Sequence, residues 1–370
     1  MDTEELIVIK YQLSIPGPTE CDPEVLNELN RPSIPHYGNL WMDYYLETLQ
    51  KLQKVYQTEN SVFIMPSSGS GALDATMASL NGKKGLILNN GTFGERLYEI
   101  ASHYLKEITV IKKDPGEWFL IEEVEKYLKK NRYDLLAVVH GETSTGMVNH
   151  LEELSKLCAK KDVLFVVDAI SSLGGVELSV DKLGIDFCVS ASQKALGSVP
   201  GLSTIAISAK GWERMASESD IPGWYLNLRT WQRYEKEWGD WHPFPITLPV
   251  HLFFALHKAL DQIFEEGLEQ RWTRHKRITE MLCTALEQEG ISLFIKNKEF
   301  LLPTVTSAVL PGERTSEGLQ TYLKEEYGIL VAGGVGPLRK KVFRIGHMAY
   351  SAQEHLIKRV IAGIKAFMKI

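Results

Sequence analysis

The chain has 370 residues, of which 44% are hydrophobic and 24% are charged, and its formal net charge is −6. This composition predicts a globular protein with a large core and two domains, and it excludes a disordered or collagen-like chain. Acidic and basic residues are mixed without a basic stripe, so we expect no nucleic-acid partner. No run of about 18 apolar residues could span a membrane and residues 1–10 lack the pattern of a secretory leader, so we expect a cytoplasmic protein with no membrane partner.

The four cysteines, Cys21, Cys158, Cys188 and Cys283, lie far apart and form no CxxC pair. This spacing favours neither a disulfide framework nor a zinc ribbon, and no metal site is predicted. We expect the four thiols to be reduced and largely buried.

Short β-branched apolar runs alternate with amphipathic helical stretches, such as residues 120–130 and 151–161, across the first part of the chain. This alternation predicts an α/β fold with a mostly parallel seven-stranded sheet wrapped by helices. The predicted strands are residues 61–65, 85–89, 108–112, 135–140, 163–168, 186–190 and 203–208.

The pattern changes after residue 208. A Trp-rich stretch at residues 221–249 is predicted to be an irregular connector, and one long helix is predicted for residues 249–290. Strands at 304–310, 329–332 and 342–345 and helices at 315–327 and 351–368 then predict a smaller C-terminal α+β domain. We therefore divide the chain into an N-terminal arm (residues 1–20), a large domain (21–250) and a long helix with a small C-terminal domain (251–370).

Residues 67–72 (SSGSGA) follow a predicted strand and open a helix. Small residues at such a junction let backbone N–H groups and hydroxyls surround an anion at the positive end of the helix. No Gly-Lys-Ser/Thr follows, so the segment is not a Walker loop, and it lacks the GxGxxG fingerprint. It predicts a phosphate-binding cup, although an ordinary helix N-cap would use the same residue types.

Two ionisable residues stand at the ends of predicted strands. Asp168 ends an apolar strand, and a carboxylate there points into the crevice where α/β folds bind ligands, where it needs a cationic partner. Lys194 follows another strand among small and apolar neighbours, which depress the pKa of a lysine and make its amine nucleophilic. The alternatives are that Asp168 caps the next turn and that Lys194 is a solvated surface residue.

A phosphate cup, a strand-end aspartate and a desolvated lysine in this order are what pyridoxal phosphate requires. The phosphate of this cofactor binds at a helix N-terminus, its ring nitrogen pairs with a carboxylate, and its aldehyde forms a Schiff base with a lysine. The three features together therefore predict a pyridoxal phosphate site.

Further segments make nearly the whole chain resemble a class V aminotransferase of fold type I, most similar to the alanine–glyoxylate and serine–pyruvate aminotransferase group. The interval between Asp168 and Lys194 (194 − 168 = 26 residues) also fits that group. The matching segments are PGP at residues 16–18, SGS at 68–70, NGTFG at 90–94, HGETSTG at 140–146, SQKAL at 192–196, GGVGP at 333–337 and FRIG at 343–346.

This resemblance implies roles for the residues around the cofactor ring. Lys194 would bind the cofactor covalently and carry the substrate proton, and Asp168 would keep the ring nitrogen protonated. Phe93 and Ile170 would pack against the two faces of the ring, and Thr143 would reach the ring oxygen.

The resemblance also implies contacts to the phosphate. Four residues would surround it: Ser68, Gly69, Ser70 and Gln193. Thr247 would contact it from the partner subunit, which implies a homodimer with shared active sites. Phe244 is a departure, because similar proteins carry there a tyrosine whose hydroxyl binds the phosphate.

Arg344 occupies the family's carboxylate-binding position, and a guanidinium binds a carboxylate through two parallel hydrogen bonds. No second arginine is spaced for a distal acid, which favours an alanine or serine type of donor and a 2-oxo acid acceptor such as glyoxylate or pyruvate. His140 and Glu142 receive no site role. The alternatives are an enzyme acting on 2-aminoethylphosphonate, ureidoglycine or pyridoxamine, a lyase such as a cysteine desulfurase using Cys283, and a noncatalytic ligand sensor.

Overall fold

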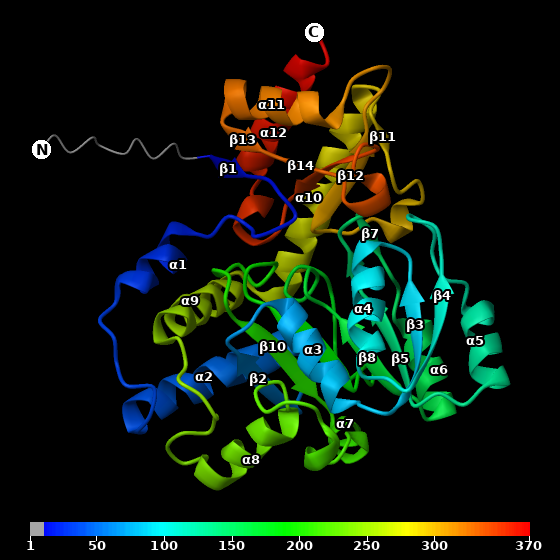
Figure 1. Cartoon of the computed structure of the whole chain (residues 1–370). Coiled ribbons are helices and arrows are strands. Elements are labelled where there is room, and N and C mark those ends of the chain that lie inside the picture. The colour runs from blue at the N-terminus through cyan, green and yellow to red at the C-terminus, as the bar shows by residue number, and fades with distance from the viewer. Residues whose placement is uncertain (1–10) are drawn as a thin grey trace, which may run out of the picture.

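The computed structural model describes residues 11–370, so residues 1–10 of the predicted N-terminal arm lie outside the described part. A seven-stranded sheet has the order β2-β10-β9-β8-β5-β3-β4 (Figure 1). Only β10 runs antiparallel to its neighbours in this sheet, which confirms the predicted mostly parallel α/β fold. The strands are β2 (Ser61–Met65), β3 (Lys84–Asn89), β4 (Glu107–Lys112), β5 (Leu135–Val139), β8 (Leu164–Asp168), β9 (Phe187–Ala191) and β10 (Ser203–Ile207).

Every residue of β5, β8, β9 and β10 is buried, as expected for strands with helices on both faces. Because β10 is antiparallel to both β2 and β9, these two strands run in the same direction as the rest of the sheet. Their carboxyl ends therefore meet at one edge. The accompanying helices are α1 (Pro23–Asn27), α2 (Asn39–Tyr56), α3 (Gly69–Ser79), α4 (Thr92–Ser102), α5 (Ile121–Lys130), α6 (Glu152–Lys161) and α7 (Ala209–Arg214).

A second sheet lies in the C-terminal part of the chain, at the top of Figure 1. Its four strands are antiparallel in the order β11-β12-β15-β14, with bounds β11 (Ser292–Leu293), β12 (Val305–Val309), β14 (Ala332–Gly333) and β15 (Phe343–Gly346). Helices α11 (Ser316–Tyr327) and α12 (Glu354–Phe367) pack beside it. The strand predicted at 329–332 is divided, because β13 (Ile329–Leu330) leaves this sheet and pairs in parallel with β1 (Gln12–Leu13).

Two sequence predictions between the sheets were wrong. The single helix at 249–290 is two helices, α9 (Val250–Glu266) and α10 (Leu268–Gln288), because Gly267 between them has a φ of +85° that ends the first helix. The connector at 221–249 contains helix α8 (Leu228–Trp238).

Helices α9 and α10 belong to different hydrophobic cores. Phe253 and Leu260 of α9 pack in the core of the large sheet, whereas Ile278 and Leu282 of α10 pack in the core of the second sheet. The division into domains stays a proposal, and this packing favours a boundary near Gly267 over one at residue 250. Among residues 11–370, no helix combines the length and the apolar character needed to cross a bilayer.

Candidate functional site

The start of helix α3 lies at the carboxyl edge of the large sheet. The Ser68 hydroxyl caps the helix by accepting a hydrogen bond from the Gly71 N–H at 3.3 Å. The first amides of a helix have no acceptor within it, so they offer donors and the positive end of the helix dipole to an anion. A Cβ at Gly69 would lie 2.6 Å from the Ile170 Cδ1, so glycine permits this close packing. The segment has the donors that a phosphate needs.

Asp168 is the last residue of β8, and its side chain is buried. Its Oδ1 accepts a hydrogen bond from the Ile170 N–H at 2.9 Å. Burial raises the pKa of this carboxyl to about 7. The Ile170 N–H opposes the shift, the negative charge of Glu142 adds to it, and the positive charges of Arg96 and Lys194 oppose it. A cation placed against Asp168 would therefore hold it ionised.

Lys194 lies three residues after the end of β9, and its side chain is mostly buried. Its Nζ donates a hydrogen bond to the carbonyl of Pro16 at 2.6 Å. Burial, followed by the positive charge of Arg344, lowers the pKa of the amine to about 8, while Asp168 opposes this shift. About a tenth of the amine is consequently unprotonated at pH 7, far more than for an ordinary lysine, and a nucleophile or a base requires this form.

One cavity of about 300 Å³ brings most of the predicted site residues together. It extends from the start of α3, past the end of β8, to the loop that follows β9. Of the predicted residues, the structure places in its wall Ser68, Gly69, Ser70, Phe93, Thr143, Asp168, Ile170, Gln193 and Lys194. The buried Oε1 of Gln193 has no hydrogen-bond partner among the described residues, which leaves it available to a bound molecule.

Arg344 lies on β15 of the second sheet and is not in the wall of this cavity, but its guanidinium contacts Thr143, which is part of the wall. Its Nε donates to the Gly333 carbonyl at 2.8 Å, and its Nη1 donates to the carbonyl of Thr143 at 3.2 Å. Burial lowers the pKa of the guanidinium to about 10, and the charge of Glu142 opposes the shift, so Arg344 stays cationic at neutral pH. The two carbonyls fix its orientation while other N–H groups remain for a carboxylate.

Glu142 is a buried carboxylate that sequence reasoning left without a role. It accepts hydrogen bonds from the N–H groups of Phe93 and Gly94, both at 3.0 Å, and from the Ser144 N–H at 3.1 Å. It therefore caps the start of α4 and holds Phe93 at the cavity wall. Glu142 is the only acidic residue in the stretch 135–148, directly after an apolar strand, and this could have indicated a buried carboxylate, which needs hydrogen-bond donors.

Arg96 is a second arginine beside the cavity, one turn along α4 from Phe93. Its guanidinium lies 4.9 Å from the centre of the Phe93 ring. The sequence analysis found no second arginine spaced for a distal acid, and the structure places Arg96 in the cavity wall. Sequence spacing could have indicated it, because residues three apart on a helix share a face.

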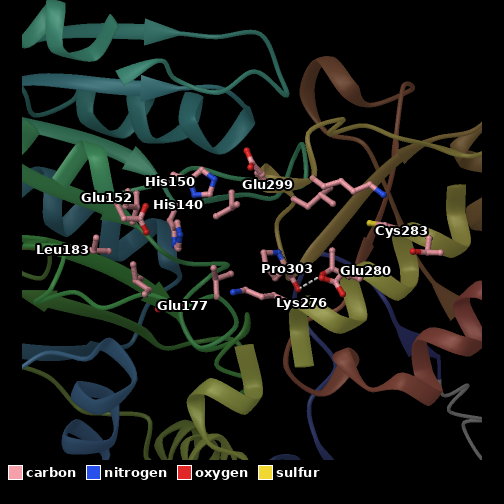
Figure 2. A pocket seen from close by; sticks show the side chains of 18 residues that line it. His140, His150, Glu152, Glu177, Leu183, Lys276, Glu280, Cys283, Glu299 and Pro303 are labelled. Atoms are coloured by element: carbon pink, nitrogen blue, oxygen red, sulfur yellow. Dashed lines mark hydrogen bonds between the residues drawn. The ribbon is translucent and has the colours of Figure 1, made fainter. Parts of the chain in front are cut away.

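His140 and Cys283 face a different cavity, of about 440 Å³, shown in Figure 2. Val139 and Gly141 line the first cavity whereas His140 between them lines the second, where its Nδ1 lies 2.9 Å from the Ser172 Oγ. Cys283 reaches this second cavity from α10, and burial raises the pKa of its thiol to about 11. Neither side chain lies in the cavity that contains Lys194.

Besides Arg344, Thr247 is the predicted site residue that this chain does not place in the cavity wall. It is exposed and absent from the cavity wall. Phe244, which replaces the family's tyrosine, is fully buried with its ring centre 4.5 Å from that of His242 and 5.3 Å from that of Tyr45.

These groups define a site for pyridoxal phosphate on a fold of type I. The start of α3 fits the phosphate, the buried Asp168 fits a protonated ring nitrogen, and the Lys194 amine lies in the same cavity. Among residues 11–370 no group of three or more His, Cys, Asp or Glu side chains could hold a metal ion.

Comparison with known proteins agrees with this chemistry. The sequence pattern of the family Aminotransferase class-V matches residues 21–355. An uncharacterized aminotransferase of Methanocaldococcus jannaschii is 38% identical over 354 residues, covering 94% of this chain and 90% of that protein. The crystal structure of alanine–glyoxylate aminotransferase from Nostoc sp. superposes with a TM-score of 0.92 at 34% identity, covering 99% of this chain and 97% of the other. The crystal structure of ureidoglycine–glyoxylate aminotransferase from Bacillus subtilis also superposes with a TM-score of 0.92. The identity is 30%, and the match covers 99% of this chain and 94% of the other.

The chain belongs to the class V aminotransferase family. It is a transaminase that uses pyridoxal phosphate. The sequence-based predictions of the family, the fold and the cofactor are thereby confirmed.

Proposed function

We propose that this transaminase moves the amino group of a small amino acid, of the alanine or serine type, to a 2-oxo acid such as glyoxylate or pyruvate. The observation that carries the proposal is that Lys194 and Asp168 lie in the wall of one cavity of about 300 Å³, while Arg344 contacts Thr143 of the same wall.

Four residues would bind the cofactor phosphate. The first amides of α3 and the hydroxyls of its first turn supply neutral donors, and the helix dipole supplies partial positive charge. Ser68, Gly69, Ser70 and Gln193 would fill this role, and all four lie in the cavity wall.

The residues at the other end of the cavity would hold the ring. Asp168 would accept a hydrogen bond from the protonated ring nitrogen, Phe93 and Ile170 would pack on its faces, and Thr143 would reach its oxygen. Bound pyridoxal phosphate supplies an electron sink for the charge that develops when a substrate loses its α-proton. The ionised Asp168 would maintain that sink by keeping the nitrogen protonated.

Lys194 and Arg344 would act on the substrate. Arg344 would bind the α-carboxylate with its free N–H groups, because the Gly333 and Thr143 carbonyls already fix the guanidinium plane. The Lys194 amine, with a pKa lowered to about 8, would take the α-proton from the substrate and would deliver it to the cofactor carbon that carried the aldehyde. Holding both groups in place converts the proton transfer into a step within one complex.

The choice of amine is the finer part of the proposal. Similarity to an alanine–glyoxylate aminotransferase supports a small amino acid as the donor. Similarity to a ureidoglycine–glyoxylate aminotransferase supports a different amine on the same fold. Ureidoglycine, pyridoxamine and 2-aminoethylphosphonate remain alternative donors. Arg96 adds a cation beside the cavity, so a donor with a second acidic group also belongs in the comparison.

A cysteine desulfurase activity is a weaker alternative. Such a lyase needs a thiolate that reaches the substrate, and Cys283 is the only cysteine after Lys194. Cys283 lies on α10 beside the second cavity in Figure 2, and burial raises its pKa. The thiol is therefore neither near Lys194 nor ionised at neutral pH.

We further propose a cytoplasmic homodimer in which Thr247 completes the phosphate site of the partner subunit. Thr247 is exposed, and large apolar side chains nearby are exposed as well, including Leu40 at 69%, Tyr37 at 49% and Trp241 at 45%. Exposed apolar surface of this kind favours burial against a second copy. Sedimentation of the purified protein tests the dimer.

A panel of half-reactions tests the proposed activity. Purified protein should be yellow, and adding a productive amino acid should remove the visible absorbance of the bound cofactor. We expect alanine or serine to act faster than aspartate, ureidoglycine, pyridoxamine or 2-aminoethylphosphonate. Lys194→Ala should lose turnover while keeping its fold, and a fully active Lys194→Ala would refute the assignment.

A further inference from the structure

The N-terminal segment of residues 12–19 connects the second sheet to the loop that carries Lys194. On one side, the Ser14 N–H donates to the Leu330 carbonyl at 2.8 Å, and the Ser14 carbonyl accepts from the Gly346 N–H at 2.9 Å. On the other side, the Thr19 N–H donates to the Gln193 carbonyl at 2.9 Å. The segment is therefore hydrogen-bonded next to Arg344 and next to Lys194.

Pro16, between these anchors, meets the lysine directly. The Pro16 carbonyl accepts a hydrogen bond from the Lys194 Nζ at 2.6 Å. The following residue, Gly17, has a φ of +127°, and a Cβ built on it would overlap Nζ and lie 2.8 Å from Cδ of the same lysine. Only glycine lets the backbone pass this close to the amine.

We propose that the Pro16 carbonyl is the positioning group that holds the Lys194 amine whenever this amine is not joined to the cofactor. The inference rests on the role proposed for Lys194, and it adds the N-terminal segment to the groups that orient the lysine amine. An uncharged amine that donates one N–H to Pro16 has its lone pair directed away from that carbonyl. This one hydrogen bond leaves the lone pair two tetrahedral directions, both away from the Pro16 carbonyl, so the backbone of residues 16–17 restricts where the amine can accept a proton.

The same N-terminal segment also contacts the strand that carries Arg344, the residue proposed to bind the substrate carboxylate. Gly346 follows Arg344 by two residues on β15, and a Cβ there would overlap the Ile15 carbonyl. Two glycines, Gly17 and Gly346, therefore let the segment pass tightly between Arg344 and Lys194. Holding the two groups at a fixed separation is what a proton transfer from a bound substrate needs.

Weakening the carbonyl alone gives the sharpest test. Replacing Gly17 by glycolic acid turns the Pro16–Gly17 amide into an ester, whose carbonyl is a poorer acceptor. The Gly17 N–H that this removes donates no hydrogen bond to another residue of the described chain. Pro200–Gly201 offers a matched control, because it is also a Pro-Gly pair and Gly201 also has a φ of +127°.

The measurement is the rate at which cofactor-free protein captures pyridoxal phosphate as a function of pH, read from the visible absorbance. Because a carbonyl stabilises an ammonium more than an amine, the ester at Gly17 should lower the apparent pKa of capture by about 0.5–1 unit. The ester at Gly201 should leave it unchanged. Equal pH profiles for the two esters and the wild type would overturn the proposal.

A steric variant gives an independent reading. Gly17→Ala places a methyl group on the lysine amine and should slow capture by at least about 10-fold, equal to about 1.4 kcal/mol. Gly201→Ala, whose Cβ meets only the flexible Cδ1 of Leu252, should stay within about 2-fold of wild type. Equal rates for the two alanine variants would also contradict the proposal.

A control on the wild type separates this proposal from the assigned function. Borohydride reduction of the cofactor-loaded protein, followed by peptide mapping, should place the cofactor on Lys194. If another residue is labelled, the proposed function fails. If Lys194 is labelled and both Gly17 variants behave as the Gly201 controls do, only the role of Pro16 fails.

Discussion

Asp168→Asn should make the cofactor-free protein more stable at neutral and alkaline pH. Burial raises the pKa of Asp168 from its ordinary value of 3.8 to about 7 in the folded chain. A carboxyl with a raised pKa favours folding while it is protonated, and this contribution is lost as the pH rises from about 4 to about 7. A difference of about 3 pH units corresponds to about 4 kcal/mol.

Asparagine keeps the acceptor for the Ile170 N–H but has no charge to bury. Urea unfolding of the cofactor-free wild type and of Asp168→Asn, near pH 5 and near pH 8, measures the effect. The advantage of the variant should be larger by about 2.7 kcal/mol at the higher pH, because about two of the three pH units over which the contribution is lost lie between pH 5 and pH 7. An advantage that does not change with pH would show that Asp168 is not protonated in the folded cofactor-free chain.

The same substitution should have the opposite effect on the loaded enzyme. Without a negative charge, residue 168 cannot keep the ring nitrogen protonated, so the half-reaction with alanine should slow by at least about 100-fold, or about 2.7 kcal/mol. If Asp168→Asn stabilises the cofactor-free protein and slows the loaded enzyme, the free-energy cost of burying the charged Asp168 carboxylate is linked to its proposed role.

Three further predictions concern other parts of the structure. Glu142→Gln places an NH₂ group against backbone N–H donors, so it should lower the free energy of unfolding in urea by about 2–4 kcal/mol. Glu153→Gln, at the exposed start of α6, is the control and should leave the urea midpoint unchanged. Arg96→Met removes one of the cations that lower the pKa of Lys194, so the apparent pKa of cofactor capture should rise; no rise would exclude this coupling. Gly267→Ala forces a side chain into a φ of +85° and should destabilise the chain by about 1–2 kcal/mol, measured as a lower melting temperature.

The sequence was informative wherever a local pattern has a local cause. Apolar and β-branched runs of strand length predicted all seven strands of the large sheet to within two residues at either end. The inner strands β5, β8, β9 and β10 gave the clearest runs, because they are buried along their whole length. The order of the phosphate cup, Asp168 and Lys194 indicated the cofactor, because the carboxyl ends of parallel strands meet at one edge. The helix break at Gly267 was missed because apolar periodicity continues across it.

Tertiary structure alone decided the features that join distant segments. Glu142 caps the start of α4, about fifty residues earlier in the chain, and Pro16 accepts a hydrogen bond from Lys194, 178 residues later. No propensity or spacing reports such pairs, since they exist only after the sheet has brought the segments together. The sequence by itself therefore determined the fold class, the cofactor and the chemical identity of the groups. The packing of the N-terminal segment between the two sheets determined how the lysine amine is aimed, because a backbone carbonyl has no signature in the sequence.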